Sequence, residues 1–401
     1  MLRRVVIVGT SLAGLRSAEA LRREGFDGRI VAIGAEPHLP YDRPPLSKEL
    51  LRGEWEPEQL VLRRQGVDDL ELDWRLEARA VALDLAAREV ELHDGERVAF
   101  EGLVIATGST PRRMPNQPNL AGVFTLRTLD DALALRELLN ARPKVVVIGA
   151  GFIGAEVAAA CRIRGLDTTV LEMLPQPMSR GLGPELGSVI AAVHRDHGVK
   201  MRTGVLVDGL EDDGSGQVRG VRLGDGSVVD ADVVVVGVGV GPETAWLEGS
   251  GLSLDNGVVC DATCLAAPGV VAAGDVARWP NPLFDGASMR LEHWTNATEQ
   301  GVHVAHRLLG RETPFAPVPF VWSDQYDRKI QTVGVVDADA EMHVAHGTLD
   351  ERQFVALFGR DGRLIGALGF NRPRFVMQYR KLIAERATWD DALAVARASS
   401  S

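Results

Sequence analysis

The sequence predicts an α/β fold with two Rossmann-like dinucleotide-binding domains and an α+β C-terminal domain. The main observation is a repeated pattern, because residues 4–14 read RVVIVGTSLAG and residues 144–154 read KVVVIGAGFIG. Each segment is a β-branched run typical of a buried parallel strand, and its glycines open onto a helical pattern. From about Pro317 onward, strands of alternating character replace this pattern. A chain of 401 residues is also too long for one core, so two or three domains are expected.

The remaining elements follow from the same periodicities. In the two repeated units we expect helices and second strands at residues 15–24, 29–33, 155–164 and 168–171. Further buried strands are expected at residues 98–105, 232–236 and 270–274. The last region is expected to follow a linker at 314–319 and to contain strands at 330–336 and 354–358 and a helix at 375–386.

Composition excludes several classes of protein. A net charge of −11 argues against general affinity for nucleic acids or acidic membranes. Between Arg4 and Gly9 there are only four apolar residues, too few for the apolar stretch of a signal peptide, and no apolar run approaches the length of a membrane span. Three cysteines, at positions 161, 260 and 264, make no disulfide framework. We therefore expect a cytoplasmic protein whose cysteine thiols are buried and unreactive.

The first repeat carries an imperfect dinucleotide-binding motif, Gly9-x-Ser11-x-x-Gly14. The first glycine makes the tight turn and the last lets the helix pack close to the strand, whereas Ser11 replaces the glycine that admits a pyrophosphate. Glu36 follows 22 residues after Gly14, near the end of the second strand, where an acid would hold a ribose hydroxyl. A purely structural glycine-rich turn is the alternative.

The second repeat is a complete match, Gly149-x-Gly151-x-x-Gly154, with Glu172 18 residues later. An acid at this position accepts a hydrogen bond from the adenosine ribose 2′-OH and repels a 2′-phosphate, which favours NADH over NADPH. Arg180 is the nearest downstream cation and a weak argument for NADPH. A surface glutamate that closes a strand is the alternative interpretation.

The chain resembles the glutathione-reductase-like flavoproteins, which bind two dinucleotides. The resemblance rests on the two glycine motifs together with Ala106-Thr107-Gly108, a strand that ends in glycine at Gly239, and Gly274-Asp275. The resemblance implies FAD at the first site, NAD(P) at the second, and a hydrogen bond between Asp275, as the acceptor, and the FAD ribityl chain. Asp275 could otherwise be an acidic turn residue after a strand. Disulfide reductases of this superfamily carry a reactive cysteine pair just after the first βαβ unit. In this chain the corresponding region, residues 40–51, contains no cysteine. Electrons must then leave the flavin directly.

Three segments resemble the bacterial FAD-dependent NADH:ferredoxin reductases, the family of putidaredoxin reductase and of the reductases of aromatic-ring dioxygenases. They read LPYDRPPLSK at 39–48, LEHWTNA at 291–297 and WSDQY at 322–326. The resemblance spans nearly the whole chain. It implies an FAD-binding domain at 1–111 and 242–316, an NAD-binding domain at 112–241 and a C-terminal interface domain at 317–401.

The implied reaction is hydride transfer from NADH C4 to FAD N5. Single-electron transfers to a [2Fe–2S] ferredoxin would follow, and the ferredoxin would supply a cytochrome P450 or a Rieske oxygenase. Two enzymatic alternatives share most of these residues, a rubredoxin reductase and an NADH oxidase. An alternative from another class is an NADH-responsive, redox-sensing binding protein that resembles apoptosis-inducing factor.

The resemblance also assigns site residues. Lys48 would lie beside the flavin N5 and pair with Glu156 from the second glycine motif, and both would be catalytic. Further positions expected to contact FAD or the nicotinamide are Arg43, Arg112, His293, Trp294 and Trp322. A capping box, Asn296-x-x-Glu299, would begin a helix whose N-terminus points at the flavin pyrimidine edge. The alternatives are surface charges for Lys48 and Glu156, solvated loop arginines and core tryptophans.

A ferredoxin partner of this type is generally acidic, so docking requires a local basic patch. The candidates are Arg307 and Arg311 together with Arg372, Arg374, Arg380 and Lys381, although solvated helix arginines are equally compatible. Two histidine pairs, His194/His197 and His303/His306, have helical spacing but no third ligand nearby in sequence. We expect solvated histidines and no metal.

Overall fold

The structure, a computed structural model, describes residues 2–62 and 68–399 and divides into two compact units. Unit 1 comprises Met1–Asp42, Leu60–Thr110 and Gly241–Pro319. Unit 2 comprises Arg43–Gln59, Pro111–Val240 and Phe320–Ser401. The mixed α/β class agrees with the prediction, and the boundaries of three domains stay a prediction. Among the described residues, no helix combines the length and apolar character needed to cross a bilayer.

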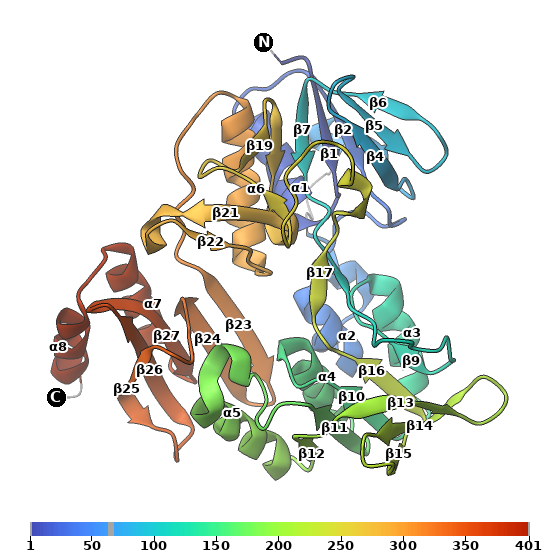
Figure 1. Ribbon diagram of the computed structural model, residues 1–401, viewed down its shortest axis with the longest axis vertical. Coiled ribbons are helices and arrows are strands. Elements are labelled where there is room, and N and C mark those ends of the chain that lie inside the picture. Colours follow the sequence, from blue (N-terminus) through green and yellow to red (C-terminus); the bar gives the residue numbers. More distant parts are fainter. Residues whose placement is uncertain (1, 63–67, 400–401) are drawn as a thin grey trace. The chain divides into compact units, whose positions relative to one another are not determined.

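Unit 1 is built on a six-stranded sheet whose central strands are parallel (Figure 1). Its strands, in spatial order, are β19 (Leu265–Ala267), β20 (Val270–Ala272), β7 (Gly102–Ile105), β1 (Arg4–Val8), β2 (Arg29–Ile33) and β3 (Leu72–Arg75). Strand β1 is the centre of the sheet, and its valines and isoleucine are almost fully buried on both faces. Strands in such a position read as continuous β-branched runs, which explains why the sequence identifies β1 and β2 accurately.

Two helices of unit 1, α1 (Leu12–Arg23) and α6 (Trp294–Leu308), pack side by side, as Figure 1 shows. Their backbones approach closely, because a Cβ added to Gly301 would lie 2.5 Å from the Ala13 carbonyl oxygen. The buried Ser17 hydroxyl closes the contact by donating to the carbonyl of either Ala13 or Gly301, at 2.8 and 3.0 Å. This packing places the first turns of both helices at the same edge of the sheet.

The predicted strand at 98–105 is wrong as a single element. Its first residues belong to β6 (Arg97–Ala99) and its last residues to β7 in the central sheet. Strand β6 is part of a separate three-stranded meander with β4 (Ala80–Asp84) and β5 (Glu89–Leu92). Apolar residues stand on both sides of Glu101-Gly102, at 98–100 and at 103–105, so hydrophobicity alone does not show the change of sheet. A further small sheet of unit 1 contains β18 (Val258–Val259), β21 (Ala277–Asn281) and β22 (Ala287–Met289).

Unit 2 contains a second parallel sheet. Its strands, in spatial order, are β12 (Lys200–Thr203), β11 (Thr168–Glu172), β10 (Val145–Ile148), β16 (Val233–Val236) and β9 (Val123–Phe124). Its helices are α3 (Leu129–Leu139), α4 (Phe152–Ile163) and α5 (Ser179–Asp196), and a meander comprises β13 (Val207–Asp212), β14 (Val218–Leu223) and β15 (Val228–Asp230). As in unit 1, the central strand β10 is fully buried and the glycine turn follows it directly.

The C-terminal part of unit 2 is a five-stranded antiparallel sheet with two helices. The strands, in spatial order, are β23 (Phe320–Gln325), β24 (Arg328–Gly334), β27 (Arg363–Phe370), β26 (Gln353–Arg360) and β25 (Glu341–Thr348), and the helices are α7 (Pro373–Ala384) and α8 (Trp389–Ser399). Helix α5 shares a hydrophobic core with this sheet, in which Leu186 and Ile190 pack with Phe354, Phe358 and Phe370. The C-terminal sheet is therefore joined to the second nucleotide-binding fold by a common core.

The remaining elements are short. They are α2 (Glu49–Arg52), β8 (Ser109–Pro111), β17 (Val240–Pro242) and the 3-10 turns at Pro44–Ser47, Pro57–Leu60, Asp68–Leu70, Ala245–Leu247, Gly274–Val276 and Pro282–Phe284.

Candidate active site

The turn after β1 requires glycine at both ends. Gly9 has φ +109°, and a Cβ there would lie 2.1 Å from the Ala106 carbonyl oxygen at the end of β7. At Gly14, a Cβ would lie 1.9 Å from the Gly9 carbonyl oxygen. Neither position has room for any side chain, so the strand, the turn and helix α1 pack as the dinucleotide-binding motif requires.

The middle position of the motif is different. In unit 2 a Cβ added to Gly151 would meet no described atom within 4 Å, so this position faces open space. Ser11 has the same place in unit 1, as the N-cap of α1 with extended backbone, just as Gly151 is the N-cap of α4. A serine hydroxymethyl group is therefore compatible with the turn itself, which explains why the imperfect motif still folds.

Two acids of unit 1 are each held by a hydroxyl donor. The Tyr41 hydroxyl donates to Glu36 Oε2 at 2.5 Å, and the Ser109 hydroxyl donates to Asp275 Oδ2 at 2.7 Å. An ionised carboxylate has about four lone-pair positions, so each acid can accept further hydrogen bonds from a sugar or ribityl hydroxyl.

The segment after β7 is tied to the chain that returns to unit 1. The Thr107 hydroxyl donates to the Glu243 carbonyl at 2.8 Å, and the Glu243 N–H donates to the Gly108 carbonyl at 3.0 Å. Ala106 is buried, and Gly108 has φ +73°. These contacts hold the Ala106-Thr107-Gly108 segment in one conformation directly behind Gly9.

Helix α6 begins at Trp294, with His293 as its N-cap, so the predicted capping box at Asn296 is wrong. Asn296 is inside the first turn, where its Nδ2 donates to Gln300 Oε1 at 3.2 Å. Trp294 is fixed by its indole N–H, which donates to Asp42 Oδ1 at 2.7 Å. Desolvation lowers the pKa of His293 to about 4, with Asp275 opposing the shift, so the ring is neutral at pH 7.

Buried polar atoms without a partner among the described residues lie in this same turn. They are His293 Nδ1, Asn296 Oδ1 and Thr298 Oγ1. Buried polar atoms are nearly always satisfied in native proteins, by protein, water or ligand. Gly274 brings the two helices together here, since a Cβ on it would lie 3.1 Å from the Ala13 Cβ in α1 and 3.8 Å from the Ala297 Cβ in α6. The residues of unit 1 therefore fit a bound polar cofactor such as the expected FAD.

In unit 2 the second glycine motif repeats this geometry. A Cβ on Gly149 would lie 2.4 Å from the Gly237 carbonyl oxygen, and one on Gly154 would lie 2.1 Å from the Gly149 carbonyl oxygen. Glu172 is oriented by the backbone, because its Oε2 accepts from the Ala150 N–H at 2.7 Å and its Oε1 from the Leu174 N–H at 2.8 Å. The carboxylate is thus attached to the glycine turn and keeps lone pairs for a ribose.

Arg112 and Gly239 are neighbours in unit 2. The Arg112 N–H donates to the Gly239 carbonyl at 2.9 Å, and Arg112 Nε donates to the Val240 carbonyl at 3.0 Å. Gly239 has φ +96°. Arg43, the other arginine expected to contact FAD, donates through Nη1 to the Arg127 carbonyl at 2.6 Å.

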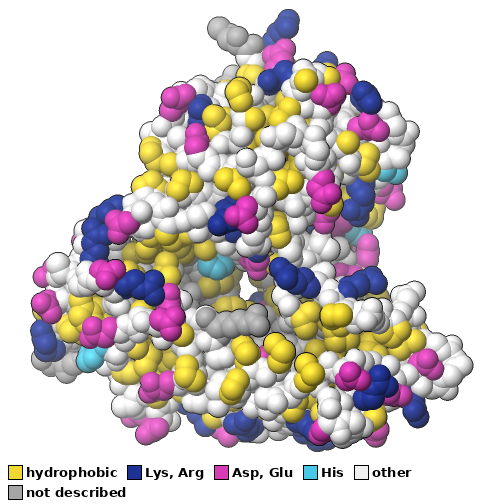
Figure 2. All heavy atoms as spheres, viewed as in Figure 1, with side chains coloured by type: hydrophobic (Ala, Val, Ile, Leu, Met, Phe, Trp, Pro, Cys, Tyr) yellow, Lys and Arg dark blue, Asp and Glu magenta, His cyan; other side chains and the backbone are white. Residues whose placement is uncertain are grey.

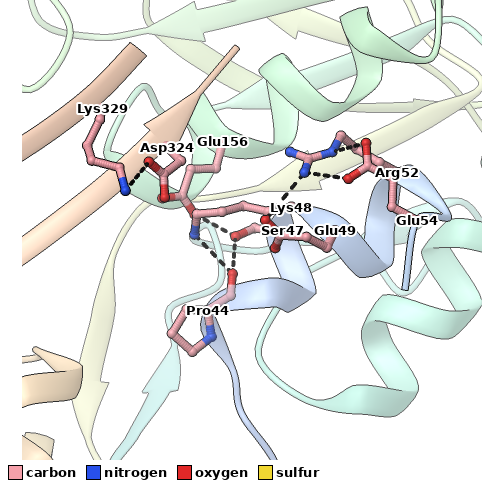
Figure 3. Close-up of polar contacts among 9 residues, drawn as sticks. All are labelled: Pro44, Ser47, Lys48, Glu49, Arg52, Glu54, Glu156, Asp324 and Lys329. Carbon is pink, nitrogen blue, oxygen red and sulfur yellow. Dashed lines mark hydrogen bonds and ion pairs between the residues drawn. The ribbon is translucent and has the colours of Figure 1, made fainter. Parts of the chain in front are cut away.

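Lys48 and Glu156 form a buried ion pair in unit 2, with 2.7 Å between Lys48 Nζ and Glu156 Oε2 (Figure 3). Their side chains are 6% and 3% exposed, so water screens the pair very little. Lys48 Nζ also donates to the Pro44 carbonyl at 2.9 Å. The structure thus brings together two residues 108 positions apart, as the resemblance implies, and their catalytic role stays a prediction.

Two hydroxyls that the sequence pattern does not single out complete this pair. The Ser47 hydroxyl donates to Glu156 Oε2 at 2.5 Å, and the Ser323 hydroxyl donates to Glu156 Oε1 at 2.6 Å. Both serines stand inside the segments that carry the resemblance, next to Lys48 and to Trp322, and that adjacency is the signal that could identify them. Trp322 itself stacks on Phe320, with ring centroids 5.9 Å apart.

The expectation of solvated histidines is wrong for His194, which is 1% exposed because α5 packs on the C-terminal sheet. Burial lowers the pKa of His194 to about 4. The expectation of buried thiols is confirmed for all three cysteines, and burial raises the pKa of Cys161 and of Cys264 to about 12. Such thiols are inert near neutral pH.

These features define an oxidoreductase with two dinucleotide sites. They are the two nucleotide-binding turns, the unpartnered buried polar atoms that fit a cofactor in unit 1, and the buried ion pair in unit 2. Residues 3–301 match the family model of the pyridine nucleotide-disulphide oxidoreductases, and residues 320–400 match that of the reductase C-terminal domain. The chain belongs to the pyridine nucleotide-disulphide oxidoreductase family, and its cofactors are FAD and NAD(H).

Relatives cover the chain almost completely. Rhodocoxin reductase of Rhodococcus erythropolis is 40% identical over 95% of this chain and 89% of its own length. The ferredoxin–NAD(+) reductase component of the anthranilate 1,2-dioxygenase system of Burkholderia cepacia is 39% identical over 96% of this chain and 95% of its own. Among solved structures, the covalent putidaredoxin reductase–putidaredoxin complex contains a chain that is 31% identical, with a TM-score of 0.93 and coverage of 99% and 98%.

Proposed function

We propose that this protein transfers electrons from NADH through FAD to a [2Fe–2S] ferredoxin that serves a cytochrome P450 or a Rieske oxygenase. The observation that carries the proposal is the buried Lys48–Glu156 pair in a chain with no cysteine at residues 40–51. Without a dithiol, electrons leave the flavin directly for an external acceptor. Relatives named as ferredoxin reductases of oxygenase systems support that acceptor.

When bound, FAD would supply the redox chemistry that converts a two-electron donor into single-electron transfers. The residues of the chain do the rest. The Gly9 turn would admit the pyrophosphate, and Glu36 and Asp275 would accept hydrogen bonds from the ribose and the ribityl chain. The N-terminus of α6 offers N–H donors and a positive dipole end to negative charge on the reduced ring.

Lys48 supplies a cation to the flavin ring in this proposal, and Glu156 holds that cation in place. A preorganised charge stabilises developing negative charge without reorganisation during the reaction. By the family resemblance, Trp294, which donates to Asp42, and Trp322 would face the flavin ring, and Arg43 and Arg112 would help to hold FAD.

The proposed function is tested first by the cofactor. The purified protein is expected to release FAD on denaturation, and excess NADH is expected to bleach the bound flavin without air. Release of FMN, or no flavin at all, contradicts the proposal.

We predict that Glu172 selects NADH. Replacing Glu172 with Gln keeps a hydrogen-bond acceptor but removes the charge that repels a 2′-phosphate, so kcat/KM for NADH should fall by about tenfold while that for NADPH rises. Steady-state kinetics with both nucleotides measure the ratio. A matched control is Glu185→Gln, an exposed acid on α5. A wild-type enzyme that already prefers NADPH would show that Glu172 does not read the ribose.

We propose that the ferredoxin docks at basic side chains of this protein. The candidate residues differ in exposure and in their ion-pair partners. Arg307 is only 15% exposed in its side chain and pairs with Glu312, and Arg311 pairs with Glu24. In α7, Arg374 and Lys381 are both exposed and lie about two turns apart on the same helical face, where Lys381 makes only a solvent-exposed ion pair with Glu385 at 3.8 Å. Figure 2 shows basic and acidic side chains interspersed over the visible face, so a docking site here is a local patch.

The docking proposal predicts a strong salt dependence. Raising ionic strength should lower kcat/KM for an acidic ferredoxin, because the Debye length is only about 10 Å at 0.1 M salt. NADH oxidation by the same enzyme with a small neutral acceptor should barely respond to salt and serves as the reference for flavin chemistry. Charge reversal of Arg374 and Lys381 together should weaken ferredoxin turnover by about tenfold at low salt, and Arg311→Glu should have a smaller effect. Unchanged ferredoxin turnover in both variants would place the docking site elsewhere.

We also propose that the protein works in the cytoplasm, which is supported by three free cysteines in a family of pyridine-nucleotide-dependent oxidoreductases.

A further inference from the structure

Glu156 is the end of a longer hydrogen-bonded chain in unit 2. Its Oε2 is occupied by Lys48 and Ser47, and its Oε1 accepts from the Ser323 hydroxyl on β23 at 2.6 Å. Ser323 is completely buried. The side of Glu156 that does not contact Lys48 is therefore held by a residue of the C-terminal sheet.

The chain continues beyond Ser323 through three further side chains. Gln325 Nε2 lies 3.1 Å from Ser323 Oγ, and Gln325 Oε1 lies 3.0 Å from His194 Nε2 on α5. The Tyr326 hydroxyl lies 3.1 Å from His194 Nδ1. Gln325 and His194 are each 1% exposed, so the chain runs through the interior rather than along the surface.

Chemistry fixes the direction of every hydrogen bond in this chain. An ionised carboxylate only accepts, so the single Ser323 proton points to Glu156 and Ser323 Oγ must accept from the Gln325 amide N–H. Gln325 Oε1 is then left to accept from His194 Nε2–H. His194 Nδ1 consequently accepts from the Tyr326 hydroxyl. All four donors point toward Glu156, and aligned hydrogen bonds polarise and strengthen one another.

The far end of the chain is held in a sparsely populated backbone conformation. Tyr326 has φ +57° in the two-residue turn between β23 and β24, a region that bulky residues rarely adopt. Its ring stacks on His197 with centroids 3.7 Å apart and an interplanar angle of 10°. A turn of this kind favours glycine or asparagine, so a tyrosine there indicates that its side chain is required.

We propose that Ser323 is a positioning residue for the Lys48–Glu156 pair, and that the one-directional chain from Tyr326 through His194 and Gln325 fixes Ser323 in the donating orientation. The chain orients the Glu156 carboxylate and thereby the Lys48 ammonium. Its effect on the flavin rests on the proposed function, whereas the direction of its hydrogen bonds does not.

The direction is tested on the full chain by ¹⁵N NMR of histidine at pH 7, with the His194 signals assigned by their loss in His194→Gln. The expected state is a neutral ring protonated at Nε2. In Ser323→Ala the amide of Gln325 loses its fixed orientation, so His194 should show a mixture of tautomers. Protonation at Nδ1 in the wild type, or an unchanged tautomer in Ser323→Ala, overturns the proposal.

The effect on the pair is tested with two matched variants of the same sheet. Ser323→Ala should slow reduction of the bound flavin by NADH by about tenfold and shift the flavin midpoint potential, because a hydrogen bond to a charged group is lost. Thr332→Val removes a buried hydroxyl of β24 outside the chain and should change neither quantity. If Ser323→Ala and Thr332→Val have the same rate of flavin reduction and the same midpoint potential, the positioning role of Ser323 is overturned. If the wild type carries no FAD or NADH does not reduce it, the proposed function fails instead, and the tautomer result still decides on the chain.

Discussion

Glu156→Ala is expected to slow reduction of the bound flavin by NADH by roughly a hundredfold, the range seen when one preorganised electrostatic contact is removed. The variant leaves the Lys48 side chain buried with no carboxylate partner. Loss of one member of a buried pair also destabilises a protein by about 3 kcal/mol or more, because the remaining charge is uncompensated. Stopped-flow absorbance measures the rate, and denaturant unfolding of the apoprotein measures the free energy of unfolding.

Unit 2 provides a matched control for this variant. Lys200 and Asp167 form an ion pair at the same 2.7 Å distance, but their side chains are 63% and 49% exposed. Asp167→Ala should therefore change the free energy of unfolding by less than about 1 kcal/mol and leave flavin reduction unaltered. Flavin reduction at the wild-type rate in Glu156→Ala would show that the buried pair is structural only.

Gly9→Ala is expected to abolish retention of FAD. The new methyl group would lie 2.1 Å from the Ala106 carbonyl oxygen, and φ +109° is itself unfavourable for alanine. Because the atoms that the methyl group would meet are backbone atoms directly after β7, the turn can relieve the contact only by separating the ends of β1 and β7. A destabilisation of about 4 kcal/mol or more is expected, in the range reached only by specific structural damage. The ratio of flavin to protein absorbance after gel filtration measures the loss.

Gly95→Ala separates the clash from the backbone strain. Gly95 also has a positive φ, +88°, but a Cβ there would meet no described atom within 4 Å. This variant should keep FAD at the wild-type ratio and lose only about 1 kcal/mol of stability. Full retention of FAD in Gly9→Ala would contradict the geometry of the first dinucleotide site.

The sequence predicts best where a structural requirement is local. A glycine turn after a buried strand depends on neighbouring backbone, so the residue pattern alone locates both motifs, including Gly9 and Gly154. The pattern also predicts strand β2 with its observed bounds, since a strand buried on both faces reads as one apolar run.

Prediction from the sequence fails where contacts between distant segments of the chain determine the surroundings of a residue. Nothing near His194 in the sequence shows that α5 packs against the C-terminal sheet, so helical spacing alone predicts a solvated ring. Helix α6 begins at Trp294 rather than at Asn296, and Trp294 donates to Asp42, a partner 252 positions away that the local sequence does not show. Ser323 lies in a segment that carries the family resemblance, but the sequence assigns it no role because its partner Glu156 is 167 positions distant.

The central claim, that electrons pass from NADH through the bound flavin to a ferredoxin, is tested most directly by an anaerobic two-step experiment. One equivalent of NADH is added to the purified enzyme, followed by two equivalents of an oxidised [2Fe–2S] ferredoxin, with absorbance and electron paramagnetic resonance recorded after each step. We expect NADH to bleach the flavin and the ferredoxin to restore its colour as two reduced iron–sulfur clusters appear. A flavin that NADH reduces but that stays reduced in the presence of every ferredoxin tried, and recovers only with oxygen, would contradict the account.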